Sequence, residues 1–546
     1  MSRRGKWWVV ITVAAACALA APACSRSVGS SPANVSLVKG LVVSTPAGSR
    51  PVSSVVWATD QDVTSLDPVL GLGYPEQTAI SLMCESLLRQ APDGSLQPGL
   101  ATVANPDPTT VVFTLRPGVK FWDGHPVTSA DVVYSLDRQL DPKLGEPWGY
   151  AFARVASIAP TSPTQVTIKL KQPDYWLEGE LASMPGIVIE KSFAQKEGGN
   201  YGTPAGSIMC TGAYMLKSWT PGVGVVAVRN PRYWNRSVHP LVGQITIKGV
   251  PDIATLTAGL ETGAIQGSYL NTQDSTLSQL EHSGSVKVFL GPGWTTDNLV
   301  VVSLTGVLGS LDVRRALSLA LNRQGIIDSV YDGAALVPRW LSNPGTFGYG
   351  DPVLTQAYDS SPLLTQNIAE AVKLVRQAGA TGKTITIGTT SQLAQVADDT
   401  AAYQAAAQAI GLKVVLKPVS EQDYSDLLFD PKFRAGVDAL PGVGYGDFGD
   451  PASMLSQSVL PDGGANYDNF SDPAITAALE QARGTADPDQ RAVLVARAEK
   501  LAVQQLPLIP DVQPATVLVL SKSLTGAVAS SAYLYSPWAN QLGGTG

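Results

Sequence analysis

Two hydrophobic periods succeed one another along the chain from about residue 53 onwards. Apolar residues alternate with polar ones in short β-branched segments, which is typical of strands, and recur every three to four residues in longer segments, which is typical of helices. The predicted strands include 53–60, 164–170, 244–250, 383–390 and 413–419. The predicted helices include 76–90, 252–263, 311–331, 367–379, 400–411, 472–484 and 487–505. This succession of strands and helices predicts α/β layers.

Local signals place the boundaries of several of these elements. Thr128 is a predicted N-cap, and Asp131 favours the positive end of the helix that follows. The segment 311–331 has an apolar stripe throughout and is predicted as one amphipathic helix. The segment 76–90 carries apolar residues at helical spacing and is also predicted as a single helix.

The first residues have the pattern of an export signal. Arg3, Arg4 and Lys6 precede an apolar run that ends in small residues before Cys24. The run is short for a membrane span, so residues 1–23 are predicted to be a secretory signal, with a lone membrane anchor as the alternative. The sequence LAAPAC resembles a bacterial lipobox, although Ala21 stands where Leu is commoner, and it predicts lipidation of Cys24. Residues 24–52 are predicted to be a flexible tether.

Four cysteines occur in the chain, and two of them remain after this assignment. Cys17 would leave with the signal and Cys24 would carry lipid, which leaves Cys84 and Cys210 in an oxidising compartment. Zinc would require more Cys or His ligands, so a disulfide is favoured over a metal pair. Such a bridge would close a loop of roughly 125 residues. In the chain-entropy model this stabilises the folded protein by about 4–5 kcal/mol.

Composition narrows the class of protein. Among 546 residues, 44% are hydrophobic and 15% are charged, which supports sizeable cores and excludes a disordered chain. The formal net charge is −7, whereas nucleic-acid-binding proteins usually carry a basic excess. We therefore expect no nucleic-acid partner.

Ordered motifs resemble one family of transport proteins. The stretch FTLRPGVKFWDGHPVTSADVVYSLDR at 113–138 is accompanied by TSLDP, LMCESLL, CTGAYMLKSW, RNPRYW and LDVRRALSLALNR. Together they are similar to family 5 of the extracytoplasmic solute-binding proteins, which serve ABC transporters of peptides and nickel. The chain departs from the family at three places. The family often has Gly-Thr where Cys210 stands, Glu-Gly where Glu85-Ser86 stands, and Asp where Gln266 stands. The two cysteines fall in neighbouring family motifs, which supports the disulfide.

The resemblance implies a two-lobed periplasmic-binding-protein-like fold of type II, in the large class with an extra inserted domain. Lobe I would comprise residues 53–75, 200–290 and 506–546, the inserted domain 76–199, and lobe II 291–505. Hinges would lie near Pro292 and Pro507, and the lobes would close around a ligand.

The loop GYGDFGDP at 444–451 is the main candidate site. A surface turn is the simplest interpretation. A calcium loop, a dinucleotide loop and a paired-carboxylate enzyme are disfavoured by the spacing and by the lack of a partner carboxylate. The loop is similar to the segment of peptide-binding relatives in which an Asp holds the ligand's α-ammonium group. Carried over by position, that residue is Asp447, while Asp450 would begin a helix with Pro451.

The resemblance also implies that the ligand backbone pairs with strand edges of the protein. The matching positions are Gly73 and Tyr74 in lobe I, and Tyr445 and Gly446 in lobe II. Trp294 is a candidate wall residue, although an aromatic residue is more often part of the core. The ligand's carboxylate has no assigned partner, because Arg434, the nearest candidate in sequence, is better interpreted as a surface residue.

These inferences predict a monomeric, non-enzymatic lipoprotein outside the cytoplasm. It would capture short peptides and deliver them to an ABC permease and its ATPase subunits, with no cofactor. The alternatives are a receptor for a nickel chelate, a sugar or a conjugate, an envelope hydrolase, and a regulatory protein on the same fold. His125, His239 and His282 form no cluster in the sequence, and no metal is expected. No G-x-S-x-G or HExxH motif supports hydrolysis.

Overall fold

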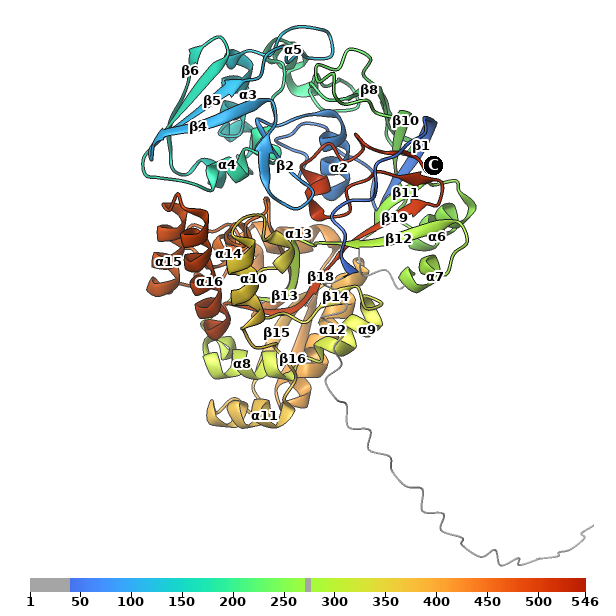
Figure 1. The fold of residues 1–546 in the computed structure, drawn as a ribbon. Helices are drawn as coiled ribbons and strands as arrows, with labels where there is room; N and C mark the ends of the chain where they lie inside the picture. The colour runs from blue at the N-terminus through green and yellow to red at the C-terminus, as the bar shows by residue number, and fades with distance from the viewer. Residues whose placement is uncertain (1–39, 271–275) are drawn as a thin grey trace, which may run out of the picture.

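The computed structural model describes residues 40–270 and 276–546 (Figure 1). The predicted signal peptide and Cys24 lie outside these residues. Figure 1 shows two bodies one above the other, with the strands β12, β13, β18 and β19 at their junction. The predicted two-lobed α/β fold is confirmed.

Lobe I is defined here by a seven-stranded sheet. Its spatial order is β12 (Val286–Gly291), β19 (Thr516–Ser521), β11 (Gly267–Leu270), β1 (Val52–Thr59), β10 (Val242–Gly249), β9 (Gly224–Arg229) and β8 (Tyr214–Thr220). The central strand β1 pairs in parallel with both β10 and β11. Its helices are α2 (Tyr74–Met83), α6 (Ile253–Thr262) and α7 (Leu277–Glu281).

Lobe II is defined by a six-stranded sheet. Its order is β14 (Ala335–Leu336), β18 (Leu508–Pro514), β13 (Thr295–Val301), β17 (Ala439–Tyr445), β15 (Thr384–Thr389) and β16 (Lys413–Pro418). Its helices are α8 (Leu311–Ala320), α9 (Arg323–Val330), α10 (Asp351–Asp359), α11 (Ile368–Gln377), α12 (Ala394–Ala409), α13 (Glu421–Phe429), α14 (Pro451–Val459), α15 (Pro473–Arg483) and α16 (Pro488–Gln505). Asp450, Asp472 and Asp487 each cap one of the last three helices, and a proline follows each of them at the first helical position.

The inserted domain is defined by a four-stranded antiparallel sheet with its own hydrophobic core. Its order is β4 (Ala101–Asp107), β5 (Thr110–Leu115), β7 (Gln165–Leu170) and β6 (Val155–Ser162). The helices α3 (Ser129–Arg138), α4 (Leu177–Glu180) and α5 (Lys191–Glu197) accompany it, together with the β2 (Leu88–Gln90) and β3 (Leu96–Pro98) hairpin. Thr128 and Asp131 form the capping box of α3, so the predicted N-cap is confirmed.

Two segments connect the lobe I and lobe II sheets. The first runs from β12 to β13 through Pro292, where a hinge is expected from the resemblance. The second runs from β18 to β19 through Ala515, and not near Pro507, because β18 pairs with β13 in the lobe II sheet. Residues 508–514 therefore belong with lobe II, and the boundary predicted at 506 is too early.

Three other predicted boundaries differ from the structure. The predicted helix 76–90 ends at Met83, because 88–90 pair as a strand with 96–98. Helix α2 packs in the lobe I core beside Trp57, so lobe I extends past residue 75. The predicted helix 311–331 is two helices, because the side chain of Asn322 caps a new helix by accepting from Gly325 N.

The second half of the predicted tether is not free. Val42 N donates to Leu290 O, Thr45 N donates to Ala527 O, and Gly48 N donates to Gln541 O. A Cβ at Gly48 would lie 2.5 Å from the backbone of Gly543, so these segments are in direct contact. Residues 42–50 are therefore fastened to the C-terminal part of lobe I.

The predicted disulfide is present. Cys84 at the end of α2 and Cys210 before β8 are bonded, and both are buried in the lobe I core. None of the helices in the described part of the chain has both the length and the apolar character that a membrane span requires.

Candidate functional site

A cavity lies at the junction of the two lobes. The cavity has a volume of about 120 Å³. Lobe I contributes the end of β1, the start of α2 and the segment after β19, while lobe II contributes β13 and β17. The walls include Asp60, Tyr74, Tyr269, Trp294, Asp297, Gln395, Val443, Tyr445, Gly446, Tyr533 and Tyr535.

Four of the six predicted ligand-binding residues line this cavity. Tyr74 and Tyr445 are 42% and 50% exposed, so their side chains are open to it, and Gly446 and Trp294 complete this part of the wall. Gly73 and Asp447 are adjacent in sequence to wall residues but are not themselves among the described residues that line the cavity.

The second half of β17 presents an open strand edge to the cavity. On one side β17 pairs with β13 from Ala439 to Tyr445. On its other side, the only pairing among the described residues joins Ala439 to Ile387 of β15. Gly446 N donates to Trp294 O, and alternation along an antiparallel ladder then turns the backbone groups of Val443 and Tyr445 away from β13. These groups can pair with an extended ligand.

Lobe I offers no corresponding strand at the predicted positions. Gly73 is the N-cap of α2 and Tyr74 is its first residue. A Cβ at Gly73 would lie 2.4 Å from Oε2 of Glu76, so the glycine makes room for a local side chain. Among the predicted positions, an open strand edge therefore occurs in lobe II, and lobe I contributes the ring of Tyr74 to the cavity wall.

Trp294 is at once a wall residue and a core residue. It is 2% exposed, its Nε1 donates to Gly345 O at 2.8 Å, and its ring stacks on Tyr535 with centroids 6.1 Å apart. Its role as cavity wall is thus fixed by packing from both lobes.

The Asp447 carboxylate is buried where lobe I, lobe II and the inserted domain meet. The hydroxyl of Tyr150, in the short 3-10 helix Gly149–Phe152, donates to Oδ2 at 2.5 Å, and the hydroxyl of Tyr535 lies 3.5 Å from Oδ1. Asp447 N donates to Ser453 Oγ at 2.9 Å. Burial raises the pKa of Asp447 to about 6, and the two tyrosine hydroxyls oppose that shift.

Two more carboxylates are buried near Asp447. Burial, together with the charge of Asp447, raises the pKa of Glu180 in α4 well above its usual value. Burial raises the pKa of Asp450 to about 6, although Arg491 and the bonds to Ala452 and Tyr349 lower it. Asp450 Oδ1 accepts from Ala452 N at 2.7 Å, which confirms its predicted part in starting α14.

Close backbone contacts hold lobe II against the hairpin loop between β2 and β3. A Cβ at Gly449 or at Gly348 would lie 2.3 Å from Gly94 O. A Cβ at Gly179 in α4 would lie 2.3 Å from the ring of Phe448. Only glycine permits these approaches, so the glycines of this loop region shape an interface between lobe II and the inserted domain.

Comparison with known proteins identifies the architecture. Residues 95–466 match the model of the bacterial extracellular solute-binding proteins, family 5 Middle. The chain belongs to this family. As a family 5 protein it resembles protein XP55 of Streptomyces lividans, with 26% identity over 476 residues that cover 84% of this chain and 82% of the relative. It also resembles the periplasmic oligopeptide-binding protein OppA of Salmonella typhimurium, with 26% identity over 82% of this chain and 85% of the relative.

Solved structures share the fold of this family 5 protein. The periplasmic binding protein DppA of Helicobacter pylori, in complex with the peptide STSA, has a TM-score of 0.76 at 20% identity, covering 91% of this chain and 99% of that one. The binding protein AgaA of A. tumefaciens R10, in complex with agropinic acid, has the same TM-score and identity over 90% and 99% of the two chains.

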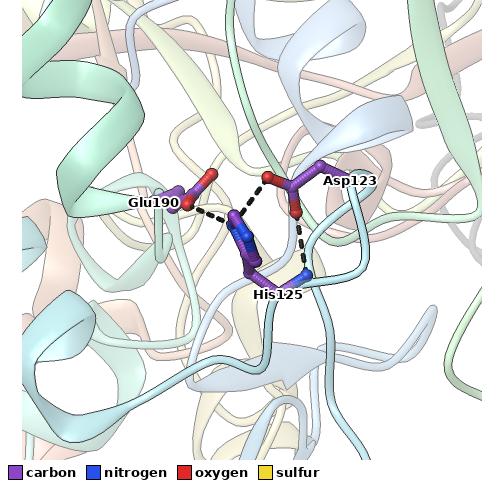
Figure 2. Close-up of side chains that lie close together, drawn as sticks. All are labelled: Asp123, His125 and Glu190. Carbon is purple, nitrogen blue, oxygen red and sulfur yellow. Dashed lines mark hydrogen bonds and ion pairs between the residues drawn. The ribbon is translucent and has the colours of Figure 1, made fainter.

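A cluster on the inserted domain was missed in the sequence. Nδ1 of His125 lies 2.9 Å from Asp123 Oδ2 and 2.9 Å from Glu190 Oε1, as Figure 2 shows. The two carboxylates raise the pKa of His125. Contact of Nδ1 with both carboxylates fastens the turn at 123–125 to the start of α5. The same three atoms have the character of metal ligands, but none of these residues lines the cavity.

Several wall residues of this family 5 protein were also missed. Asp60 directly follows β1, and residues at the carboxyl ends of parallel strands often face ligands, so the sequence held a signal for it. Tyr533 and Tyr535 lie far along the chain with no motif around them. Their place in the wall comes from tertiary packing against α2 and Tyr269.

Proposed function

We propose that this solute-binding protein captures short peptides in the cavity between its lobes. The open edge of β17 at Val443–Tyr445 carries the proposal, because it lies on the wall of a cavity and none of the described strands pairs with it there. An extended peptide is a natural partner for such an edge, since its own backbone groups must be satisfied when it is buried. The printed name of OppA and the peptide in the DppA complex support this substrate class.

Asp447 is proposed as the partner of the peptide's α-ammonium group. Its carboxylate lies one residue beyond the wall at Gly446 and is held by two hydroxyls. The contact with Tyr535 is the longer of the two, and the ammonium group would replace it. A charge-assisted hydrogen bond of this kind contributes about 1.5–3 kcal/mol.

The remaining parts of the proposal concern transport. Lipidation of Cys24 would hold the protein at the outer face of the membrane, and the protein would act as a monomer without catalysis. Closure over the peptide would present the closed form to an ABC permease, whose ATPase subunits drive import. The agropinic acid in the AgaA complex favours a non-peptide small solute as the second candidate ligand.

Calorimetry on the protein from Ser25 onward tests the proposal. The protein is unfolded and refolded to remove bound ligand, and is then titrated with peptides of two to six residues. The same peptides are tested with an acetylated N-terminus, and with single N-methyl groups that block backbone pairing. Asp447→Asn is compared with Asp462→Asn, which removes an exposed carboxylate elsewhere in lobe II.

The expected result is binding that is weakened by N-methylation, by acetylation and by Asp447→Asn, but not by Asp462→Asn. Binding that ignores acetylation and Asp447→Asn would remove the ammonium assignment. A folded protein that binds no peptide would leave the small-solute receptor.

A further inference from the structure

Carboxyl groups from both lobes lie at the cavity walls. Asp60 lies on the lobe I side and Asp297, in β13, on the lobe II side. No Lys, Arg or His is among the described residues that line the cavity. A ligand in this cavity therefore meets the exposed carboxylate of Asp60 and lies near Asp297, which is 2% exposed and accepts from the hydroxyl of Tyr331.

Aromatic side chains form a large part of the remaining lining. Five tyrosines and Trp294 line the same space. Tyr533 and Tyr269 stack with ring centroids 3.5 Å apart, so they present a rigid aromatic surface. Aromatic rings attract cations to their faces, and carboxylates attract them directly. Both kinds of wall residue therefore favour a positively charged ligand.

The side chain of Tyr74 lies near three carboxyl groups. Although Tyr74 is 42% exposed, the surrounding protein desolvates its hydroxyl and raises its pKa, and the charges of Asp297, Asp60 and Asp447 raise the pKa further. Its hydroxyl therefore senses carboxylates from both lobes. The nearby buried Arg323 donates to Pro510 O and to Ser318, and is not part of the cavity wall.

We propose that the ligand is cationic: a short peptide that carries a Lys or Arg side chain in addition to its α-ammonium group. This inference rests on the proposed function only in taking the ligand to be a peptide. The basic side chain lies between Asp60 and Asp297, among the tyrosines. The peptide's C-terminal carboxylate stays outside the cavity, because inside it would lose its hydration and meet no cation on the walls.

The test uses the refolded protein and tetrapeptides that differ at one residue. Lys, Gln or Glu is placed at each position in turn, and every peptide is made as a free acid and as an amide. At the preferred position the Lys peptide is expected to bind about tenfold more tightly than the Gln peptide, and the Glu peptide more weakly than both. Added NaCl is expected to reduce the preference for Lys and to leave the Gln peptide nearly unchanged.

Two variants and one control locate the charge. Asp60→Asn changes a residue that is exposed to the cavity, and Asp297→Asn keeps an oxygen that can accept from Tyr331. Each is expected to lower the Lys-to-Gln ratio several-fold without weakening the Gln peptide. Asp328→Asn, on the exposed face of α9, is the matched control. Circular dichroism confirms that each variant is folded.

The outcomes separate the two proposals. Equal affinity for Lys, Gln and Glu peptides overturns the cationic ligand and keeps the peptide receptor. Binding of a simple diamine such as cadaverine, with no binding of any peptide, keeps the cationic ligand and overturns the peptide receptor. A folded protein that binds neither peptides nor diamines overturns both.

Discussion

The hydroxyl of Tyr150 lies 2.5 Å from Oδ2 of Asp447, although 297 residues separate the two in the chain. Tyr150 belongs to the inserted domain and Asp447 to the loop after β17 in lobe II. The bond therefore exists only while these two parts of the molecule are in contact. The environment of Asp447, the proposed partner of the ammonium group, therefore depends on whether the cleft is closed.

Tyr150→Phe is expected to weaken closure. The substitution removes the shorter of the two hydroxyl contacts to a buried carboxylate, which costs about 1–3 kcal/mol. Small-angle X-ray scattering of the ligand-free protein should show a larger fraction of open molecules. Tyr134→Phe is the control, because the Tyr134 hydroxyl makes no hydrogen bond to the described residues. Equal scattering from wild type and Tyr150→Phe would show that the bond does not hold the lobes.

Closure of the ligand-free protein is expected to weaken as the pH rises. Burial in the closed form raises the pKa of Asp447 from 3.8 to about 6, so the closed form binds the proton more tightly than an open, hydrated form does. Closure is therefore most favourable below about pH 4 and loses up to about 3 kcal/mol by pH 7. Glu180, whose pKa is also raised, acts in the same direction.

Scattering between pH 4 and pH 7 measures this dependence. The open fraction should grow with pH, and Asp447→Asn should flatten the curve because an amide does not titrate. Peptide affinity should show the opposite sign, rising with pH through about 6, since only the ionised Asp447 attracts an ammonium group. A ligand-free protein that closes more at higher pH would contradict the burial argument.

Gly449→Ala is expected to block full closure. Its Cβ would lie 2.3 Å from Gly94 O, and a backbone atom cannot move aside as the end of a side chain can. The shift needed to relieve the contact costs about 1–3 kcal/mol, and peptide affinity should fall by about tenfold or more. Gly284→Ala, which meets nothing within 4 Å, should bind peptide as the wild type does. Unchanged affinity in Gly449→Ala would place this contact outside the closing interface.

The fold could be predicted from the sequence because its motifs are local and ordered. The capping box at Thr128 and the Asp-Pro helix starts depend on neighbouring residues, and they appear where the sequence predicts them. The hinge expected near Pro507 came from the resemblance alone, and strand β18 was not predicted. Strand β18 contains Pro510 and Pro514, and prolines argue against a strand between two others. The register shift in β13 between Asp297 and Asn298 accompanies this irregular pairing.

The candidate site could be predicted only in part. Tyr445 and Gly446 were predicted from a motif, and both line the cavity. Tyr445 ends strand β17, and Gly446 directly follows it. The environment of Asp447 could not be predicted, because Tyr150 and Tyr535 reach it from opposite ends of the chain. The cavity charge at Asp60 and Asp297 likewise depends on which strands the fold brings together.

Arg483 and Asp174 form the most enclosed ion pair between lobe II and the inserted domain among the described residues. Their side chains are 11% and 1% exposed, and the guanidinium makes bonds of 2.9 Å and 2.6 Å to the two carboxylate oxygens. The Arg483 guanidinium also lies 5.2 Å from the ring of Trp176. This pair is positioned to align the two parts as they close, since its bidentate geometry fixes direction as well as distance.

Arg483→Met is therefore expected to open the molecule. It would leave the Asp174 carboxylate buried without its cation, which costs about 3–5 kcal/mol in the closed form and little in an open form where water reaches it. Asp174→Asn in the Arg483→Met background should restore part of the closure, because the unpaired charge is then gone. Arg497→Met, at an exposed position on α16, is the control. If the double variant scatters as openly as Arg483→Met alone, the loss comes from missing contacts of the arginine and not from the stranded charge.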